Sequence, residues 1–153
     1  MRYILRVFVA VTSVLTVASP ASAGSVHSAT VDKAYVEHML YATSMNGFIA
    51  AVGSDQWFDW STDFCSAPLV GNTGRSFNFT NPCRRHDFGY RNQHLLERRY
   101  GPGYWNSASR KRVDQQFLAD MKAHCWSRPW YDEPACFSWA ATFYAAVRVT
   151  GGP

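Results

Sequence analysis

Hydrophobic positions recur every three to four residues along much of this chain, which is the period of an amphipathic helix. Apolar side chains fall on one face from Thr30 to Ala42, and Ser44 to Gly53 repeats the pattern over a shorter length. Three later segments continue it, at 82–99, 107–124 and 136–147. The pattern therefore predicts a small, mainly helical domain.

Breakers divide the helical segments. An Asn-Pro pair at 81–82 predicts a helix start, because Asn can cap a helix and Pro fits its first turn. That helix continues to Asn92 or as far as Arg99, and the Gly-Pro-Gly run at 101–103 ends it. Residues 66–80 are rich in Ser, Asn, Gly and Pro with little periodicity, which indicates a loop.

The first 23 residues read as a secretory signal peptide. A basic start is followed by an apolar run and by an Ala-x-Ala site at 21–23. A membrane anchor is the competing interpretation, but the apolar run from Val7 to Ala18 is short for a bilayer span. We therefore expect a secreted, extracellular protein whose mature part, residues 24–153, forms a single domain.

The formal charge of +4 falls to +2 without the two leader arginines, since 13 basic and 11 acidic residues remain. Between Arg84 and Arg112 lie eight basic residues and two acidic ones, a local balance of +6. Such a patch suits an anionic membrane surface, and a solvated helix face without a partner remains open. Nothing in an exported protein favours nucleic acid, and a monomer is the default expectation.

All the cysteines lie in the mature part, at positions 65, 83, 125 and 136. An even number of cysteines in an exported chain implies two disulfides, for which three pairings exist. A zinc site is the alternative, but the chain has no Cys-x-x-Cys pair and the compartment is oxidising.

The candidate chemistry gathers on the helix that follows Pro82. Cys83 precedes His86 by three positions and Asp87 by four, so the three side chains share one broad face. His86 and Asp87 themselves point about 100° apart, so one can face a partner helix while the other faces a loop. The acidic segment 59–65 is that loop. A lone histidine on a helix is usually structural. His86 is a candidate catalytic residue only because Cys83, Asp87 and the acidic segment accompany it.

The combination of Asp-x-Cys at 63–65 with Cys-x-x-His-Asp at 83–87 resembles the secreted phospholipase A2 superfamily. The sequence pattern F-D-W-S-T-D-x-C … C-x-R-H-D-F-G-Y-R-N is similar to that of its bacterial and fungal branch. The resemblance runs from about Phe58 to the C-terminus. It implies an all-α fold, disulfide-stapled, in which two long antiparallel helices carry a His/Asp dyad. It also favours, with the sequence order, the pairings Cys65–Cys83 and Cys125–Cys136.

The resemblance assigns the catalytic dyad to His86 and Asp114. His86 would act as a general base on water, and Asp114, in the Arg-x-Asp motif at 112–114, would fix its tautomer. Asp120 is the rival carboxylate, but six residues rotate it about 240° from Asp114, so both cannot face His86. We expect Asp120 to be exposed. Tyr90 is a further candidate, either packed beside the dyad or hydrogen-bonded to Asp114.

The distance along the chain raises a question of register. If the first helix runs to Arg99, His86 lies roughly 20 Å from its end, whereas Asp114 lies roughly 10 Å from Ser107. Either the connecting loop corrects this difference or the helix stops near Asn92.

A calcium ion is the cofactor that the resemblance implies. Asp63, Asp87 and the carbonyl oxygen of Phe64, with waters, would form an oxygen-only site. The chain lacks the glycine-rich calcium loop of the animal enzymes, so we expect weak binding. Asp63 as a simple Asx-turn residue is the alternative.

The function implied is calcium-dependent hydrolysis of the sn-2 acyl ester of glycerophospholipids, at a phospholipid membrane or micelle surface. The alternative is a catalytically silent lipid- or protein-binding module on the same scaffold. Such a module would usually have lost His86, Asp114 or a calcium ligand, and here none is missing.

Overall fold

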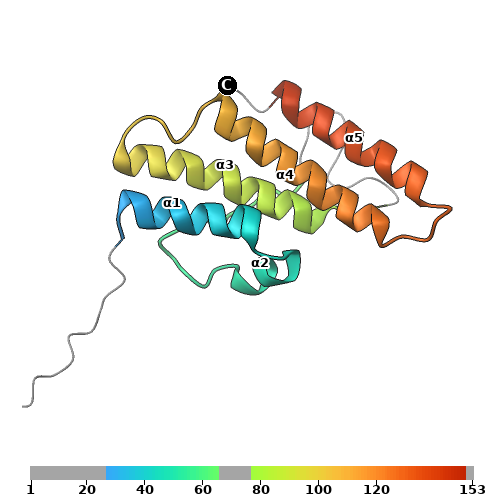
Figure 1. Cartoon of the computed structure of the whole chain (residues 1–153), viewed down its shortest axis with the longest axis horizontal. Coiled ribbons are helices and arrows are strands. Elements are labelled where there is room, and N and C mark those ends of the chain that lie inside the picture. Colours follow the sequence, from blue (N-terminus) through green and yellow to red (C-terminus); the bar gives the residue numbers. More distant parts are fainter. Residues whose placement is uncertain (1–26, 66–76, 151–153) are drawn as a thin grey trace, which may run out of the picture.

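The computed structural model describes residues 27–65 and 77–150 (Figure 1). The expected signal peptide and most of the loop predicted at 66–80 lie outside these residues. Every regular element in the described part is a helix, so the all-α prediction is confirmed. The elements are α1 (Ala29–Glu37), the π-helical turn η1 (His38–Ala42), α2 (Met45–Ala51), α3 (Thr80–Tyr100), α4 (Ser107–Trp126) and α5 (Glu133–Thr150).

Three long helices set the architecture. α4 lies between α3 and α5, with α3 and α4 running antiparallel, and α1 lies along the opposite side of α3 (Figure 1). The short helix α2 packs below α3. None of the helices in the described ranges combines the length and apolarity needed to cross a membrane.

The start of α3 differs from the prediction. The helix begins at Thr80, and Asn81 does not cap it. The N-cap residue is Phe79, which makes no side-chain capping bond, and the side chain of Asn78 just before it accepts the N–H of Thr80 at 3.0 Å. Pro82 still lies in the first turn, where its missing N–H has no partner to lose.

The end of α3 resolves the question of register. The helix continues to Tyr100 and ends at Gly101, whose φ of 96° suits glycine. The connecting loop then doubles back along α3. The N–H of Gly103 donates to Glu97 at 3.1 Å, and the Trp105 ring lies 4.4 Å from that of His94, between centroids. The interpretation that the helix stops near Asn92 is therefore wrong, and the loop corrects the register.

The core divides into two clusters of buried side chains. One surrounds the disulfides and comprises Cys65, Phe77, Phe79, Cys83, Phe117, Met121, Cys125, Cys136, Ala140 and Phe143. The other joins α1, α2, α3 and α4 and comprises Val36, Leu40, Phe48, Phe58, Phe88, Leu96 and Val113. Gly89 allows α3 and α4 to approach closely, since a Cβ there would lie 2.7 Å from Cγ1 of Val113. This close approach lies one turn from His86.

Part of the basic patch is internal. Arg85 and Arg110 are only 3% and 9% exposed, so the local balance of +6 is not all presented to solvent. Arg85 lies 3.3 Å from Asp120, whose side chain is 10% exposed. The expectation that Asp120 is exposed is therefore wrong. The helical period turns Asp120 away from His86, but it turns it toward Arg85 on α3 and not toward solvent.

Candidate active site

His86 on α3 and Asp114 on α4 meet at the centre of the helix pair. Nε2 of His86 lies 2.8 Å from Oδ1 of Asp114, across 28 residues of chain. The Asp114 side chain is fully buried, and that of His86 is 10% exposed. Because Asp114 engages Nε2, the ring proton belongs there and Nδ1 carries a lone pair. Nδ1 makes no hydrogen bond to any other described residue.

Asp114 is held by further donors. The hydroxyl of Tyr90 donates to Oδ1 at 2.7 Å. On the other oxygen, Oδ2 accepts from Nη1 of Arg148 at 2.6 Å, with Nε of Arg110 at 3.8 Å. Burial alone would raise the pKa of Asp114, but the hydrogen bonds from His86, Arg148 and Tyr90 outweigh it and hold the pKa below its usual range. The group is therefore a fixed carboxylate anion.

Aromatic rings fix the orientation of His86. Its ring centroid lies 4.3 Å from that of Tyr90 and 4.7 Å from that of Phe117. Tyr90 therefore does both things expected of it, since it packs against His86 and hydrogen-bonds to Asp114.

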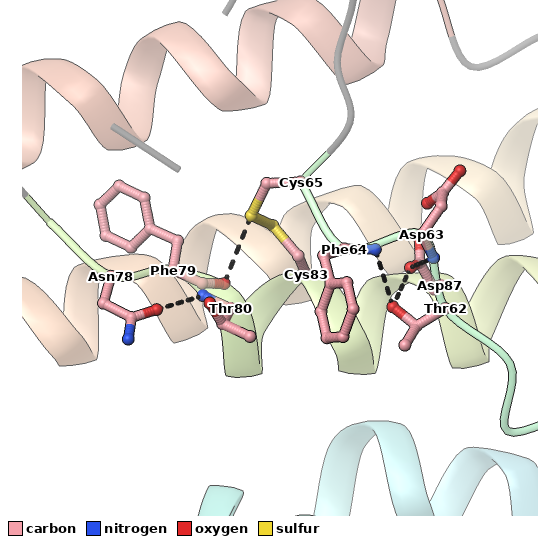
Figure 2. The surroundings of a disulfide bond; sticks show 9 residues. All are labelled: Thr62, Asp63, Phe64, Cys65, Asn78, Phe79, Thr80, Cys83 and Asp87. Carbon is pink, nitrogen blue, oxygen red and sulfur yellow. Dashed lines mark hydrogen bonds between the residues drawn. A yellow bond between two sulfur atoms is a disulfide. The ribbon is translucent and has the colours of Figure 1, made fainter. Parts of the chain in front are cut away.

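The acidic loop reaches α3 through Asp87. Oδ2 of Asp87 accepts from Oγ1 of Thr62 at 2.5 Å and from the N–H of Asp63 at 3.1 Å. The Cys65–Cys83 disulfide ties the end of this loop to the same helix (Figure 2). The structure thus contains the pairing that the resemblance favoured, and it contains the second one, between residues 125 and 136, as well.

The backbone at the end of the loop adopts an unusual conformation. Phe64 has a φ of 59°, in the left-handed region that residues other than glycine seldom occupy. The disulfide at the next residue and the hydrogen bond from the N–H of Phe64 to Oγ1 of Thr62, 3.0 Å, hold it there.

Asp87 lies in an environment that disfavours an isolated negative charge. Burial raises its pKa to about 6, the hydrogen bond from Thr62 opposes this rise, and the nearby charge of Asp63 adds to it. A cation bound beside Asp87 would relieve both the burial and the repulsion.

The residues present suit a hard cation by their chemistry. Asp63, Asp87 and the Phe64 carbonyl offer only oxygen atoms, as calcium prefers. The Asp63 side chain is 64% exposed, and its Oδ2 lies 4.0 Å from Nη2 of Arg91. Within the described ranges no group of three or more His, Cys, Asp or Glu side chains is arranged to hold a metal. Backbone and solvent oxygens would therefore have to complete the shell.

A pocket of about 140 Å³ brings these parts together. Its lining is Asp63, Phe64, Cys65, Cys83, His86, Asp87, Phe117, Phe143, Val147 and Thr150. The dyad histidine and the acidic loop thus share one cavity, and α4 and α5 supply its apolar side. Asp114 lies behind His86 and does not line the pocket.

Comparison with known proteins agrees with this geometry. The model of the prokaryotic phospholipase A2 family matches residues 36–151. The chain belongs to this family. Secretory phospholipase A2 of Arthroderma benhamiae is 34% identical over 94 residues, 60% of this chain and 58% of that protein. Secretory phospholipase A2 of Beauveria bassiana is 37% identical over 97 residues, 61% of this chain and 44% of that protein. The chain therefore spans about half the length of these relatives.

For this member of the prokaryotic phospholipase A2 family, sequence reasoning missed two arginines of the site. Arg110 precedes Asp114 by four residues on α4, a spacing that could have identified it. Arg148 comes from the last turn of α5, and no local pattern connects it to Asp114.

Proposed function

We propose that the protein is a secreted, calcium-dependent phospholipase A2. It hydrolyses the sn-2 acyl ester of glycerophospholipids to a lysophospholipid and a fatty acid. One observation carries the proposal: the ring of His86 borders the same pocket as Asp63 and Asp87 while its far nitrogen binds the buried Asp114. Family membership and the names of the two fungal relatives support it.

His86 is the general base of the proposed reaction. Its Nδ1 takes a proton from a water molecule as the water oxygen attacks the ester carbonyl. The proton then passes from Nδ1 to the leaving alkoxide of the lysophospholipid, which restores the neutral ring. Asp114 stabilises the imidazolium between these steps and keeps the proton of the resting ring on Nε2.

The other partners of Asp114 are positioning residues. Tyr90, Arg110 and Arg148 come from α3, α4 and α5, so all three long helices fix one carboxylate. Arg110 is itself anchored, since its Nη2 donates to the carbonyls of Val147 and Arg148 at 2.9 and 2.7 Å. Rigid support of this kind keeps the imidazole in one orientation for proton transfer.

The residues that would hold calcium are Asp63, Asp87 and the Phe64 carbonyl. When bound, calcium supplies positive charge for the developing oxyanion and for the lipid phosphate. Because the pKa of Asp87 is raised to about 6, this carboxyl is largely ionised at neutral pH and becomes a poor ligand under mildly acidic conditions.

An aromatic turn supports a lipid surface as the partner. Trp126, the last residue of α4, is 68% exposed, and Trp130 and Tyr131, in the connection between α4 and α5, are 81% and 66% exposed. The Cys125–Cys136 disulfide closes this connection. Trp and Tyr are favoured at the level of lipid head groups because their rings are apolar at one end and polar at the other. We propose that the monomeric, exported protein contacts its substrate surface here.

Fatty-acid release from phospholipid vesicles tests the proposal. We expect release that stops when calcium is chelated and that falls by at least 10²–10⁴ in His86→Gln. His94→Gln is the matched control, because His94 lies on the same helix but packs on Trp105. Full activity in His86→Gln would show that the enzyme assignment is wrong and would favour the silent binding module.

The calcium site is tested separately. Asp63→Asn and Asp87→Asn should each abolish calcium-dependent activity at ordinary calcium levels while the fold stays near wild type. Calorimetric titration with calcium should show weakened binding in both variants. Unchanged calcium affinity in both variants would show that Asp63 and Asp87 do not bind calcium.

A further inference from the structure

A second cavity, of about 510 Å³, lies on another part of the molecule. It is bordered by α1, η1, the middle of α3, the loop after α3 and the start of α4. It shares no lining residue with the 140 Å³ pocket of the dyad. Nothing in the proposed reaction uses it.

Two polar side chains that line the second cavity lack partners. Gln93 is 7% exposed and makes no hydrogen bond to another described residue. The hydroxyl of Tyr41 is buried and has no partner among the described residues either. Buried polar groups are almost always hydrogen-bonded, because an unpaired one loses its interaction with water and gains nothing. Burial raises the pKa of Tyr41 to about 12, so its hydroxyl remains a donor.

The charged residues around the cavity give it a positive balance. The guanidinium of Arg112 lies over the Tyr41 ring, 3.9 Å from its centroid, and 3.2 Å from Oε1 of Glu37. Lys33 is exposed on the neighbouring turn of α1 and has no ion pair within the described ranges. Two cations against one carboxylate leave a net charge of +1 at the cavity.

The start of α4 does not contribute free amides to this cavity. Asn106 caps the helix, and its Oδ1 accepts the N–H groups of Ala108 and Ser109 at 3.0 Å each. The donors open to a ligand are therefore side chains: the ammonium of Lys33, the guanidinium of Arg112 and the amide of Gln93.

We propose that the second cavity is a binding site for a phosphate group, carried either by an anionic phospholipid head group or by free phosphate. Three donors of different kinds line one space, and a phosphate offers several strong acceptor oxygens for them. Arg and Lys are the usual partners of phosphate, Arg through its planar fork and Lys as a point charge. A metal cation does not fit, because Glu37 is the sole carboxylate among the described residues that line the cavity and it is paired with Arg112.

Titration of inorganic phosphate into the full-length protein, followed by amide chemical shifts, tests the free anion. Lys33→Gln and Arg112→Gln should each weaken binding about tenfold, whereas Glu37→Gln should strengthen it. The matched controls are Lys122→Gln and Arg98→Gln, which remove the same charges at exposed sites away from the cavity. Gln93→Leu should weaken binding without changing the net charge.

Vesicle sedimentation tests the lipid source. It compares phosphatidylglycerol with phosphatidylcholine vesicles, in the His86→Gln background with calcium chelated, so that nothing is hydrolysed. Weaker binding of Lys33→Gln to phosphatidylglycerol alone identifies the head group as the source. Loss of inorganic phosphate binding with unchanged vesicle binding identifies free phosphate. If Lys33→Gln and Arg112→Gln match their controls in both assays, the site does not exist.

Gln93 is buried, so a thermal unfolding curve accompanies each variant, and the exposed variants carry the test if Gln93→Leu does not fold. None of these binding measurements depends on hydrolysis. A negative result here therefore leaves the proposed phospholipase activity untouched, and a failed activity assay leaves this site untouched.

Discussion

The described part of the chain contains two clusters in which a histidine ring meets a buried aspartate. The dyad cluster consists of His86, Tyr90, Asp114 and Arg148, and the N-terminal cluster consists of His27, Asp32, Trp57 and Tyr100. In each cluster a ring nitrogen lies 2.8 Å from a carboxylate oxygen, and a tyrosine hydroxyl donates to the same carboxylate at 2.7 Å. Both aspartate side chains are fully buried.

The surroundings separate the two clusters. His27 stacks on Trp57 with 4.3 Å between ring centroids, and its aspartate lies only five residues along the chain. His86 reaches across two helices and borders a pocket that also holds Asp63 and Asp87. A histidine bound to a buried carboxylate is therefore not by itself evidence of catalysis, because the same arrangement also stabilises a fold. What distinguishes His86 is that it borders a cavity and that Asp63 and Asp87 line the same cavity.

The N-terminal cluster ties α1 to the far end of α3. Asp32 on α1 accepts from Nε1 of Trp57 at 2.5 Å and from the Tyr100 hydroxyl, and Arg99 lies 4.0 Å from the same oxygen. Burial alone would raise the pKa of Asp32, but the bonds from Trp57, His27 and Tyr100 hold it below its usual value. We therefore expect this cluster to stabilise the fold, and we expect catalysis only from the dyad cluster.

The largest effect, on the rate of fatty-acid release, should come from comparing the replacement of His86 by glutamine with the same replacement of His27. His86→Gln should lower the rate of fatty-acid release by at least 10²–10⁴, because it removes the proton acceptor. His27→Gln should leave the rate per folded molecule unchanged and lower the unfolding temperature. Rate measurements at saturating calcium, normalised to folded protein by circular dichroism, check both. A loss of rate in His27→Gln would mean that the two clusters are not distinct.

Replacing the two aspartates should separate activity from stability in the same way, with a smaller difference in rate than for the two histidines. Asp114→Asn should cost less activity than His86→Gln, since Asp114 only orients and stabilises the ring. The losses should not add in the double variant, because the pair acts as one unit. Asp32→Asn should destabilise the fold and preserve the rate. Additive losses in a His86/Asp114 double-mutant cycle would contradict the dyad.

What the sequence revealed was mainly local. Helical spacing placed Cys83, His86 and Asp87 on one face, and the later helices followed from periodicity and breakers. The contacts of Arg148 and Asp120 were not predictable, because each depends on how one helix is rotated and shifted against another. The register itself was set by a loop whose path, beside Glu97 and Trp105, has no signature in the pattern of hydrophobic residues.

The buried ion pair between Arg85 and Asp120 can also be compared with the dyad. Asp120→Asn should leave the rate per folded molecule unchanged but lower the free energy of unfolding by about 1–3 kcal/mol, because Arg85 loses a buried partner. Urea unfolding measures the loss. Asp132→Asn is the matched control, since its pair with Arg128 is more exposed and should matter by less than about 1 kcal/mol. A large loss of rate in folded Asp120→Asn would show that Asp120, and not Asp114, is the functional carboxylate partner of His86.

The smallest expected effect is a difference in acid sensitivity. Because the pKa of Asp32 in the folded protein lies below its ordinary value of 3.8, the ionised carboxylate stabilises the fold above that value. This contribution is lost as pH falls through the lowered pKa. The gap in unfolding free energy between wild type and Asp32→Asn should therefore shrink as pH falls from about 5 toward 3. Urea unfolding at half-unit steps follows it, with Asp132→Asn as the control. A gap that stays constant down to pH 3 would show that the hydrogen bonds to Asp32 do not favour its ionised form.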